Sequence, residues 1–357
     1  MHKQFMLAAL EQARLGRGVC APNPCVGAVA VHNNKIVASA WHQGVGTAHA
    51  ELSTLQLVPA GIRGVTLYVT LEPCNHWGKT PPCVSAIINA GVSSVVYAYR
   101  DPNPVVAAND TPRILSEQGI DVLHLPLREI NEFYRSYQYW TQTKKPWVTA
   151  KIAQTLDGKI AGVNGQKIQL SNDLCTKFTH KQRLYTDVIL TTAKTIQNDS
   201  PSLNVRLENI NKSKPVAIID TRLSLSDDAK IFTSASHCHV YHDGNIPVKK
   251  RRVNCSYHAV TAIDGRLDLT VVINHLGLLG FHNIWVEAGG HLFSSLHEQG
   301  LVQTTYLYIV PVILGNDAVS AYHGINFFNR PHTILWQTQA DNMIACLEWQ
   351  ENECLPD

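Results

Sequence analysis

Two separate runs of alternating helical and strand patterns constrain the fold of this chain more than any other feature. The first run ends with a stripe of apolar and aromatic side chains at helical spacing over 127–143. Lys144-Lys145-Pro146 ends that stripe, because proline disfavours helical backbone at the preceding residue. The alternation then restarts, and 357 residues are more than one hydrophobic core usually serves. We therefore predict two α/β domains, 1–145 and 146–357, in each of which helices cover the faces of a sheet.

The patterns also predict the individual elements. In the first domain they are, in chain order, a helix at 5–13, strands at 25–31 and 35–39, a helix at 48–58, a strand at 65–70, a helix at 83–90, a strand at 94–99, a helix at 111–118, a strand at 121–124 and the helix at 127–143. In the second domain they are a strand at 147–153, a helix at 172–185, strands at 188–191 and 215–220, a helix at 269–279, a strand at 283–287, a helix at 291–299 and a strand at 303–310, with 207–215 as a surface connection.

The composition excludes several classes of protein. Lys and Arg number 30 against 28 Asp and Glu, and this net charge of +2 lacks the basic excess of a non-specific nucleic-acid binder. Hydrophobic residues make up 45% of the chain and charged residues 16%, which excludes disorder over most of it. We see no signal peptide, and no uncharged apolar run approaches the roughly 18 residues of a membrane span. The nine cysteines do not pair off evenly, so we expect reduced thiols and a cytoplasmic protein without nucleic-acid or membrane partners.

One histidine and two cysteines form a pattern typical of a zinc site. His49 and Glu51 stand at the start of an expected helix. Cys74 follows an expected strand, and Cys83 begins the next helix. One imidazole and two thiolates suit Zn²⁺ and leave the fourth tetrahedral position for water, whose proton the nearby carboxylate can move. This is the His-x-Glu…Pro-Cys…Cys signature of the zinc-dependent deaminases.

The spacing of the cysteines leaves an alternative open. The usual signature has two residues between its cysteines, whereas the eight residues 75–82 separate Cys74 from Cys83. In the alternative interpretation, the two cysteines are buried thiols that bind no metal, and His49 and Glu51 lie near them in sequence by chance. The zinc site is favoured because a strand end and a helix start are the places where the two thiolates would have to lie.

Several stretches of the first domain carry a resemblance to a known family. They are Pro22-Asn23-Pro24-Cys25-Val26-Gly27, His42 with Gly46 before His49, the run from Thr70 to Cys83, and Asp101-Pro102-Asn103-Pro104. These stretches resemble the deaminase half of the RibD family of bifunctional riboflavin-biosynthesis proteins, in which eight residues between the cysteines are the norm. The resemblance implies a cytidine-deaminase-like three-layer α/β/α domain that deaminates 2,5-diamino-6-ribosylamino-4(3H)-pyrimidinone 5′-phosphate.

The resemblance also implies roles for single residues of this domain. It implies that His49, Cys74 and Cys83 hold zinc and that Glu51 is the catalytic proton shuttle. The residues that it places in the substrate pocket are Asn23, His42, His76 and Lys79. A flexible lysine ammonium suits an anionic substrate, although a plain loop lysine and surface histidines would look the same in sequence.

Stretches of the second domain resemble the reductase half of the same family. They include 151–159, 191–195, 203–206, 218–220, 285–292 and 308–315. The resemblance implies a dihydrofolate-reductase-like α/β domain that uses NADPH to reduce the ribosyl group of 5-amino-6-(5-phosphoribosylamino)uracil to ribityl. The implied substrate contacts are Arg183, Leu203, Arg206 and Glu287. The implied NADPH contacts are Gln154, Gln169, Thr195, Asp199, Thr221, Gly289, Gly290, His291, Leu292, Phe293, Ser294 and Ser295. The partners would be phosphorylated pyrimidines, and the assembly a homodimer or a homotetramer.

Two loops depart from the family's pattern. The family usually has Gly-x-Ser-x-Trp before a helix of its reductase half, whereas this chain has Lys167 and Gln169 at the serine and tryptophan positions. The serine that touches substrate and the tryptophan beside the cofactor are therefore absent. In the deaminase half, Ala108-Asn109-Asp110 replaces two glycines and a basic residue. The first departure leaves an alternative open, a zinc deaminase whose second domain is impaired or only binds a ligand. A nucleic-acid-editing deaminase is a third hypothesis, which the balanced charge opposes.

Overall fold

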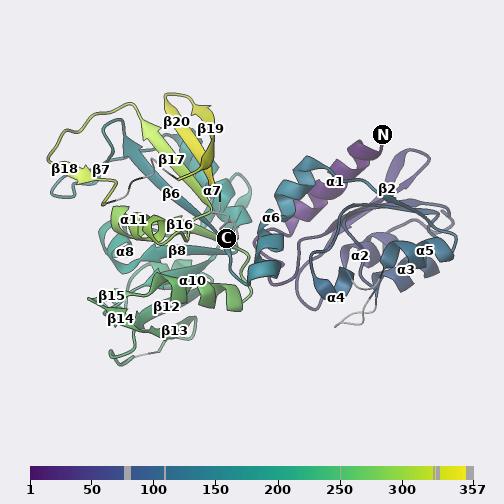
Figure 1. The fold of residues 1–357 in the computed structure, drawn as a ribbon, viewed down its shortest axis with the longest axis horizontal. Coiled ribbons are helices and arrows are strands. Elements are labelled where there is room, and N and C mark those ends of the chain that lie inside the picture. The colour runs from purple at the N-terminus through teal and green to yellow at the C-terminus, as the bar shows by residue number, and fades with distance from the viewer. Residues whose placement is uncertain (76–81, 108–109, 250, 325, 327–329, 351–357) are drawn as a thin grey trace, which may run out of the picture. The chain divides into compact units, whose positions relative to one another are not determined.

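The structure is a computed structural model that describes residues 1–75, 82–107, 110–249, 251–324, 326 and 330–350. It divides into two compact units, Met1–Lys144 and Lys145–Asp357 (Figure 1). Among the described residues, no helix combines the length and the apolar character needed to cross a membrane.

The first unit is built on one mixed sheet. Its elements are α1 (His2–Leu15), β1 (Gly27–His32), β2 (Lys35–Trp41), α2 (Ala50–Gln56), β3 (Thr66–Leu71), α3 (Cys83–Asn89), β4 (Ser94–Tyr99), α4 (Pro104–Ala107), α5 (Thr111–Glu117), β5 (Asp121–His124) and α6 (Arg128–Thr143). The strands lie in the order β2-β1-β3-β4-β5. β1 is antiparallel to β2 and β3, whereas β3, β4 and β5 are parallel to one another.

Helices cover both faces of this sheet, because successive strand residues point to opposite sides. α1 and α6 pack on one face, against Val29 and Val96 among others. α2, α3 and α5 pack on the other face, against Ala28 and Val95 among others. Neighbouring residues of β1 and β4 thus pack into the cores on opposite faces of the sheet. The expected three-layer α/β/α domain is confirmed.

The second unit is built on a larger sheet. Its elements are β6 (Trp147–Thr155), β7 (Lys159–Val163), α7 (Asp173–Tyr185), β8 (Val188–Thr192), α8 (Ala193–Asp199), β9 (Val205–Leu207), β10 (Ile210–Lys212), β11 (Pro215–Ile219), α9 (Ile231–Ser234), β12 (His237–Asp243), β13 (Cys255–Val260), β14 (Ala262–Ile263), β15 (Arg266–Leu267), α10 (Leu269–Leu278), β16 (Asn283–Glu287), α11 (Gly290–Glu298), β17 (Thr304–Val310), β18 (Ala318–Ser320), β19 (His332–Gln339) and β20 (Asn342–Trp349). Nine strands lie in the order β13-β12-β11-β8-β16-β6-β17-β20-β19. All neighbours from β13 to β17 are parallel, and β20 and β19 extend the sheet with antiparallel pairing.

Hydrophobic cores lie on both faces of the larger sheet. On one face, α10 and α11 pack against Val188 and Leu190 of β8. On the other face, α8 and α9 pack against Ile189 of β8 and Trp285 of β16. The expected α/β architecture of the second domain is therefore also confirmed.

Several elements of the second unit differ from the sequence-based expectation. Residues 207–215, expected to be a surface connection, contain β10, which pairs with β9 as a short antiparallel hairpin. The strands β7, β12, β13, β19 and β20 were also not predicted. β12 and β13 extend the parallel sheet beyond β11, and each pairs with the strand that precedes it in the chain.

Gly27 allows the first helix to pack closely on the sheet. A Cβ atom at this position would lie 2.1 Å from the carbonyl oxygen of Ala9 and 2.3 Å from the amide nitrogen of Ala13. Both atoms belong to the backbone of α1, so a clash cannot be relieved by turning a side chain. Any larger residue at position 27 would force α1 away from β1.

We predict that Gly27→Ala lowers the free energy of unfolding of the first unit by about 1–3 kcal/mol or more, because the added methyl overpacks the contact with α1. Urea denaturation followed by circular dichroism measures this loss. Gly244→Ala is the matched control, since its Cβ would meet only the Cβ of Ala259 at 3.7 Å. Equal stability of the two variants would contradict the close-packing argument.

Candidate functional site

The ends of three elements bring the expected metal ligands together. His49 is the residue immediately before α2, with extended backbone. Cys74 lies just beyond the end of β3, and Cys83 is the first residue of α3. α2 and α3 pack on the same face of the sheet, so their starting ends meet beside the end of β3.

The three side chains offer a compact donor set for a metal ion. Nδ1 of His49 lies 3.1 Å from Sγ of Cys83 and 3.5 Å from Sγ of Cys74. One ligand atom from each residue lies within 4.8 Å of the other two. A tetrahedral Zn²⁺ with bonds of about 2.0–2.3 Å needs donor atoms about 3.5 Å apart or slightly more. Small shifts of the three side chains would bring their donor atoms to these separations. The residues therefore fit a zinc ion.

The backbone and the second thiol favour the thiolate form of Cys74. The hydrogen bond with the Cys83 side chain lowers the pKa of the Cys74 thiol, against the effect of burial. The amide of Cys83 also donates to Sγ of Cys74 at 3.5 Å. A thiolate, and not a thiol, is the form that binds a metal.

Glu51 is a buried carboxyl beside this donor set. It lies in the first turn of α2 and its side chain is 3% exposed. Burial raises the pKa of Glu51 to about 7, and the nearby Cys74 contributes in the same direction. Its Oε2 atom has no hydrogen-bond partner among the described residues. A carboxyl that is half ionised near neutral pH and has a free oxygen can take up and release a proton during a reaction.

His42 and Asn23 form a rigid pair next to the donor set. Nδ1 of His42 donates to the carbonyl of Ala48 at 3.1 Å, and Nε2 accepts from Nδ2 of Asn23 at 3.0 Å. The ring centroids of His42 and His49 are 5.4 Å apart. Burial lowers the pKa of His42, so the ring is neutral at pH 7. The structure therefore brings two of the four expected pocket residues to the metal cluster; the other two, His76 and Lys79, lie outside the described residues.

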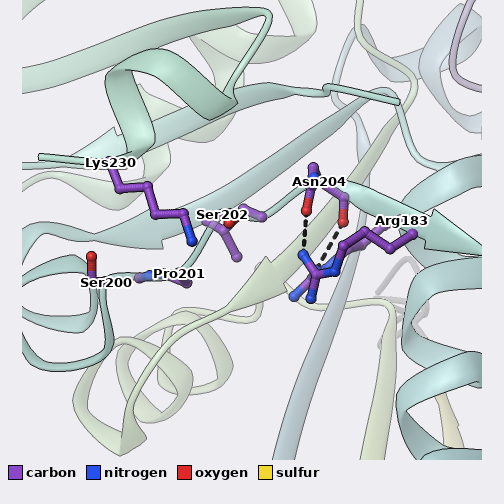
Figure 2. A pocket seen from close by; sticks show the side chains of 8 residues that line it. Arg183, Ser200, Pro201, Ser202, Asn204 and Lys230 are labelled. Carbon is purple, nitrogen blue, oxygen red and sulfur yellow. Dashed lines mark hydrogen bonds between the residues drawn. The ribbon is translucent and has the colours of Figure 1, made fainter. Parts of the chain in front are cut away.

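A pocket with a volume of about 380 Å³ opens in the second unit. It contains all but one of the expected reductase substrate contacts, and its lining residues are Arg183, Ser200, Pro201, Ser202, Leu203, Asn204, Arg206 and Lys230 (Figure 2). The backbone of Leu203 has a left-handed φ of 45°. The fourth expected contact, Glu287, is not among the lining residues and accepts two hydrogen bonds from Arg183.

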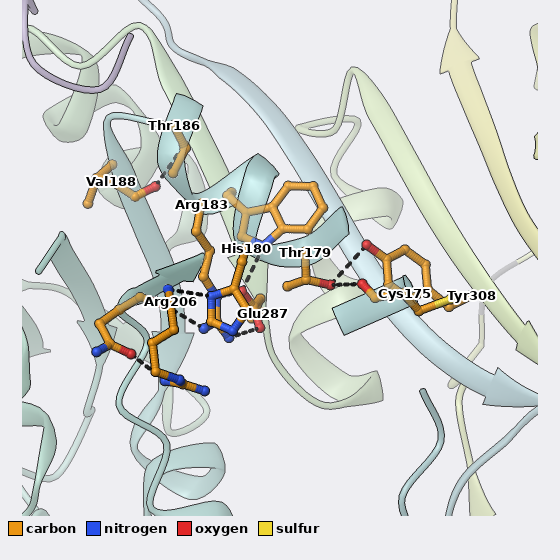
Figure 3. A network of polar contacts seen from close by, with 11 residues as sticks. Cys175, Thr179, His180, Arg183, Thr186, Val188, Arg206, Glu287 and Tyr308 are labelled. Atoms are coloured by element: carbon orange, nitrogen blue, oxygen red, sulfur yellow. Dashed lines mark hydrogen bonds and ion pairs between the residues drawn. The ribbon is translucent and has the colours of Figure 1, made fainter. Parts of the chain in front are cut away.

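The contact between Arg183 and Glu287 is a two-pronged ion pair (Figure 3). Nε of Arg183 donates to Oε1 at 2.6 Å, and Nη2 donates to Oε2 at 2.8 Å. The indole nitrogen of Trp285 donates to the same carboxylate at 2.8 Å. Burial alone would raise the pKa of Glu287, but the charge and hydrogen bonds of Arg183 outweigh it and lower the pKa to about 2. Both side chains are therefore charged at neutral pH.

Lys151 lies next to Glu287 and is not among the site residues predicted from the sequence. It is paired with Glu287 across neighbouring strands β6 and β16. Its Nζ atom lies 5.0 Å from the ring centroid of Tyr308. Burial lowers the pKa of Lys151, against the effect of Glu287. The sequence signal for Lys151 was a single lysine in the middle of a largely apolar strand pattern. Lysine is rarely buried unless it has a charged partner, so such a position is a candidate functional residue.

Several of the expected cofactor contacts lie at one edge of the sheet. β11, β8, β16 and β6 are parallel neighbours, so their carboxyl ends meet there. Gln154 lies near the end of β6, Thr195 lies in the first turn of the helix after β8, Thr221 follows β11 and Gly289 follows β16. This edge, with loops that lead into helices, is where α/β sheets bind their ligands.

The helix after β16 meets this edge through its backbone. Leu292 and Phe293 lie in the hydrophobic core, and Oγ of Ser294 accepts from the amide of His323 at 3.0 Å. A Cβ at Gly290 would lie 2.5 Å from the carbonyl oxygen of Ala321. The ring of His291 stacks on His323. A ligand would therefore meet the backbone at the start of α11, with Ser295 one turn further on.

The unusual loop of the second domain contacts an expected cofactor residue. Nζ of Lys167 lies 3.6 Å from Oδ1 of Asp199, and both side chains are exposed. The side-chain Nε2 of Gln169 donates to the backbone carbonyl of Ser171 at 3.3 Å. The two residues that replace the serine and tryptophan of the family pattern thus have local partners of their own.

Two family models match different parts of the chain. Residues 1–99 match the cytidine and deoxycytidylate deaminase zinc-binding region. Residues 146–344 match the RibD C-terminal domain. The first match contains His49, Glu51, Cys74 and Cys83, and the second contains the whole pocket around Arg183.

Individual proteins match over most of the chain. The riboflavin biosynthesis protein RibD of Bacillus amyloliquefaciens is 33% identical over 88% of this chain and 86% of its own length. The protein of the same name from Escherichia coli is 33% identical over 88% and 89%. A Thermotoga maritima diaminohydroxyphosphoribosylaminopyrimidine deaminase/5-amino-6-(5-phosphoribosylamino)uracil reductase superimposes with a TM-score of 0.86 at 27% identity, over 98% of this chain and 99% of that one. Acinetobacter baumannii RibD superimposes with a TM-score of 0.84 at 26% identity over the same shares.

We predict that Glu287→Gln lowers the free energy of unfolding of the second unit by about 3–5 kcal/mol at pH 7, because it leaves the buried Arg183 charge without a partner. The pKa of Glu287 is lowered from 4.5 to about 2, so the carboxylate stabilises the fold fully above about pH 5 and loses this effect as the pH falls toward 2. The difference between the wild type and the variant should therefore shrink on acidification.

Urea denaturation at pH 7 and at about pH 3 measures both differences. Glu208→Gln is the control, since Glu208 is exposed and has no acidic or basic partner among the described contacts. A difference that stays constant with pH would show that the variant acts through packing and not through the charge of Glu287.

Proposed function

This chain belongs to the RibD family of bifunctional deaminases and reductases of riboflavin biosynthesis, and on that basis we propose which of its residues carry out each reaction. The observation that supports the proposal most is the convergence of His49, Cys74 and Cys83 beside the buried Glu51. The resemblance gave these roles from sequence, and the geometry of each side chain is compatible with its role.

In the first domain, the proposed reaction is deamination of 2,5-diamino-6-ribosylamino-4(3H)-pyrimidinone 5′-phosphate. His49, Cys74 and Cys83 would hold zinc, which when bound makes a water ligand acidic enough to attack near neutral pH. Glu51 takes the proton of the attacking water and delivers it to the departing amine, because its raised pKa suits both steps. Asn23 and His42 orient the pyrimidine, and His76 and Lys79 are assigned to the same pocket.

In the second domain, the proposed reaction is reduction of the ribosyl group of 5-amino-6-(5-phosphoribosylamino)uracil, for which NADPH would supply the hydride. Arg183, Leu203 and Arg206 bind the substrate from the pocket, and Glu287 fixes the direction of Arg183. Lys151 lies beside Glu287 on the neighbouring strand and is a candidate proton donor, because burial lowers its pKa. Several of the expected NADPH contacts, among them Gln154, Thr221 and Gly289, follow or end strands at the carboxyl edge of the sheet.

A second candidate is a zinc deaminase whose other domain is impaired or only binds a ligand. The contact between Lys167 and Asp199 favours it, because Asp199 is an expected NADPH contact that here faces an ammonium at 3.6 Å. Exposed ion pairs of this kind contribute little energy, so NADPH could displace Lys167 at small cost. We therefore place the bifunctional enzyme first.

The remaining proposals concern location and assembly. We propose that the protein works in the cytoplasm, which the odd count of nine cysteines supports, because they cannot all pair within the chain. We also propose a homodimer or a homotetramer, which light scattering after size-exclusion chromatography would distinguish from a monomer.

We predict that the purified chain with zinc converts the diaminopyrimidine substrate with release of ammonia, and that added NADPH is then oxidised in proportion to the product formed. Absorbance of NADPH and an ammonia assay on the same sample follow the two steps. Ammonia release without NADPH oxidation at saturating cofactor would support the second candidate instead.

We predict that Glu51→Gln keeps its zinc but loses ammonia release by a factor of about 100 or more, because the neutral amide cannot carry the proton. Elemental analysis measures the zinc and an ammonia assay the reaction. Cys83→Ala is the matched comparison, since it should lose zinc as well as activity. Deamination at the wild-type rate would remove Glu51 from the mechanism.

A further inference from the structure

The pocket beside Arg183 is also lined by Lys230, a cationic residue to which the proposed function assigns no role. Three of its eight lining residues, Arg183, Arg206 and Lys230, are positively charged, and none of the eight is acidic. We propose that Lys230 is a substrate-binding residue, which together with Arg206 holds the phosphate group of the reductase substrate. This inference rests on the proposed function, because a phosphorylated substrate is the ligand assigned to the pocket.

Arg183 lines the pocket, but its positive charge is largely neutralised by Glu287. Two of its nitrogens donate to the two oxygens of Glu287 at 2.6 and 2.8 Å. A third, Nη1, donates to the carbonyl of Asn204 at 2.9 Å. The two charged side chains are only 11% and 14% exposed, so their charges cancel at short range. A dianionic ligand therefore needs its balancing charge from other residues.

Arg206 and Lys230 carry the uncompensated charge. Arg206 donates to the side chain of Asn204, which is neutral, and its own amide donates to Nδ1 of His180 at 3.0 Å. Among the described residues, no carboxylate forms an ion pair with either cation. Two free positive charges match the charge of about −1.5 to −2 on a phosphate monoester at neutral pH.

The acidic residues closest to Lys230 in sequence are engaged elsewhere. Asp227 forms an ion pair with Arg252, whose Nη2 also donates to the Asp227 carbonyl at 2.6 Å. Asp228 accepts a hydrogen bond from the hydroxyl of Ser226. Both carboxylates therefore have partners outside the pocket.

The backbone around Lys230 is fixed against the pocket wall. Lys230 immediately precedes α9, whose first residue, Ile231, is fully buried. The hydroxyl of Ser234 donates to the carbonyl of Ser202, a lining residue, at 2.8 Å. Figure 2 shows the Lys230 side chain extending toward Ser202 from the side opposite Arg183. A phosphate group beside Ser202 would thus lie next to the ammonium of Lys230.

The inference predicts an effect that is specific to the phosphate. A lysine ammonium acts as a point charge, so it adds affinity for the phosphate without aligning the reacting sugar. In the full chain, Lys230→Met should raise the KM for 5-amino-6-(5-phosphoribosylamino)uracil by about tenfold, with kcat changed less than about twofold. The KM for the dephosphorylated substrate should not change. Lys230→Arg should restore most of the affinity.

Steady-state NADPH oxidation with both substrates measures these constants. Inorganic phosphate serves as a competitive inhibitor, and its inhibition constant should rise in Lys230→Met by a similar factor. Lys177→Met is the matched control, because Lys177 is an exposed lysine of α7 that does not line the pocket. A wild-type KM in Lys230→Met, or an equal loss for both substrates, would overturn the inference.

The inference and the proposed function fail in different ways. If the wild type oxidises no NADPH with either substrate, the reductase assignment fails, and calorimetric titration with inorganic phosphate then decides the role of Lys230. Weaker phosphate binding in Lys230→Met than in Lys177→Met would support the inference, and equal binding would overturn it.

Discussion

Parallel strand pairing is the constraint on which both candidate sites depend. In a parallel sheet the carboxyl ends of neighbouring strands lie along one edge, and the loops that leave them lead into helices. In the first unit this arrangement places Cys74 after β3, where the starts of α2 and α3 supply His49 and Cys83. In the second unit it gathers loops after four adjacent strands around the expected cofactor position. The chemistry of each domain is therefore set by short segments whose positions the sheet determines.

The sequence predicted the first site well because each of its residues is tied to the end of a regular element. His49 immediately precedes a helix, Cys83 begins one and Cys74 follows a strand, so local patterns were enough to place them. The missed strands lack such signals. β12 contains three histidines and a cysteine, and its burial depends on pairing with β11 and β13 and not on its own composition. β10 has one apolar residue of three, so its hairpin resembled a polar loop.

The second site could be predicted only in part, because its central contact joins residues far apart in sequence. Arg183 and Glu287 are 104 positions apart, and no local pattern shows that one neutralises the other. The same holds for Lys151, which lies next to Glu287 only because β6 pairs with β16. Resemblance named the arginine and the carboxylate as two substrate contacts. In the structure the arginine donates two hydrogen bonds to the carboxylate.

The pocket contains two kinds of cation: Arg183, which is largely buried and paired with Glu287, and Arg206 and Lys230, which have no carboxylate partner in the described part of the chain. A desolvated pair is screened little by dissolved salt, so it keeps its direction at any physiological ionic strength. Its opposite charges cancel beyond a few ångströms, so it exerts little pull on an anion still in solution. Long-range attraction is left to exposed charges, whose reach is limited to about 8 Å at physiological salt. For the proposed substrate, ionic strength would therefore change the rate of association with the pocket, while the orientation of the bound molecule would depend little on the surrounding electrolyte.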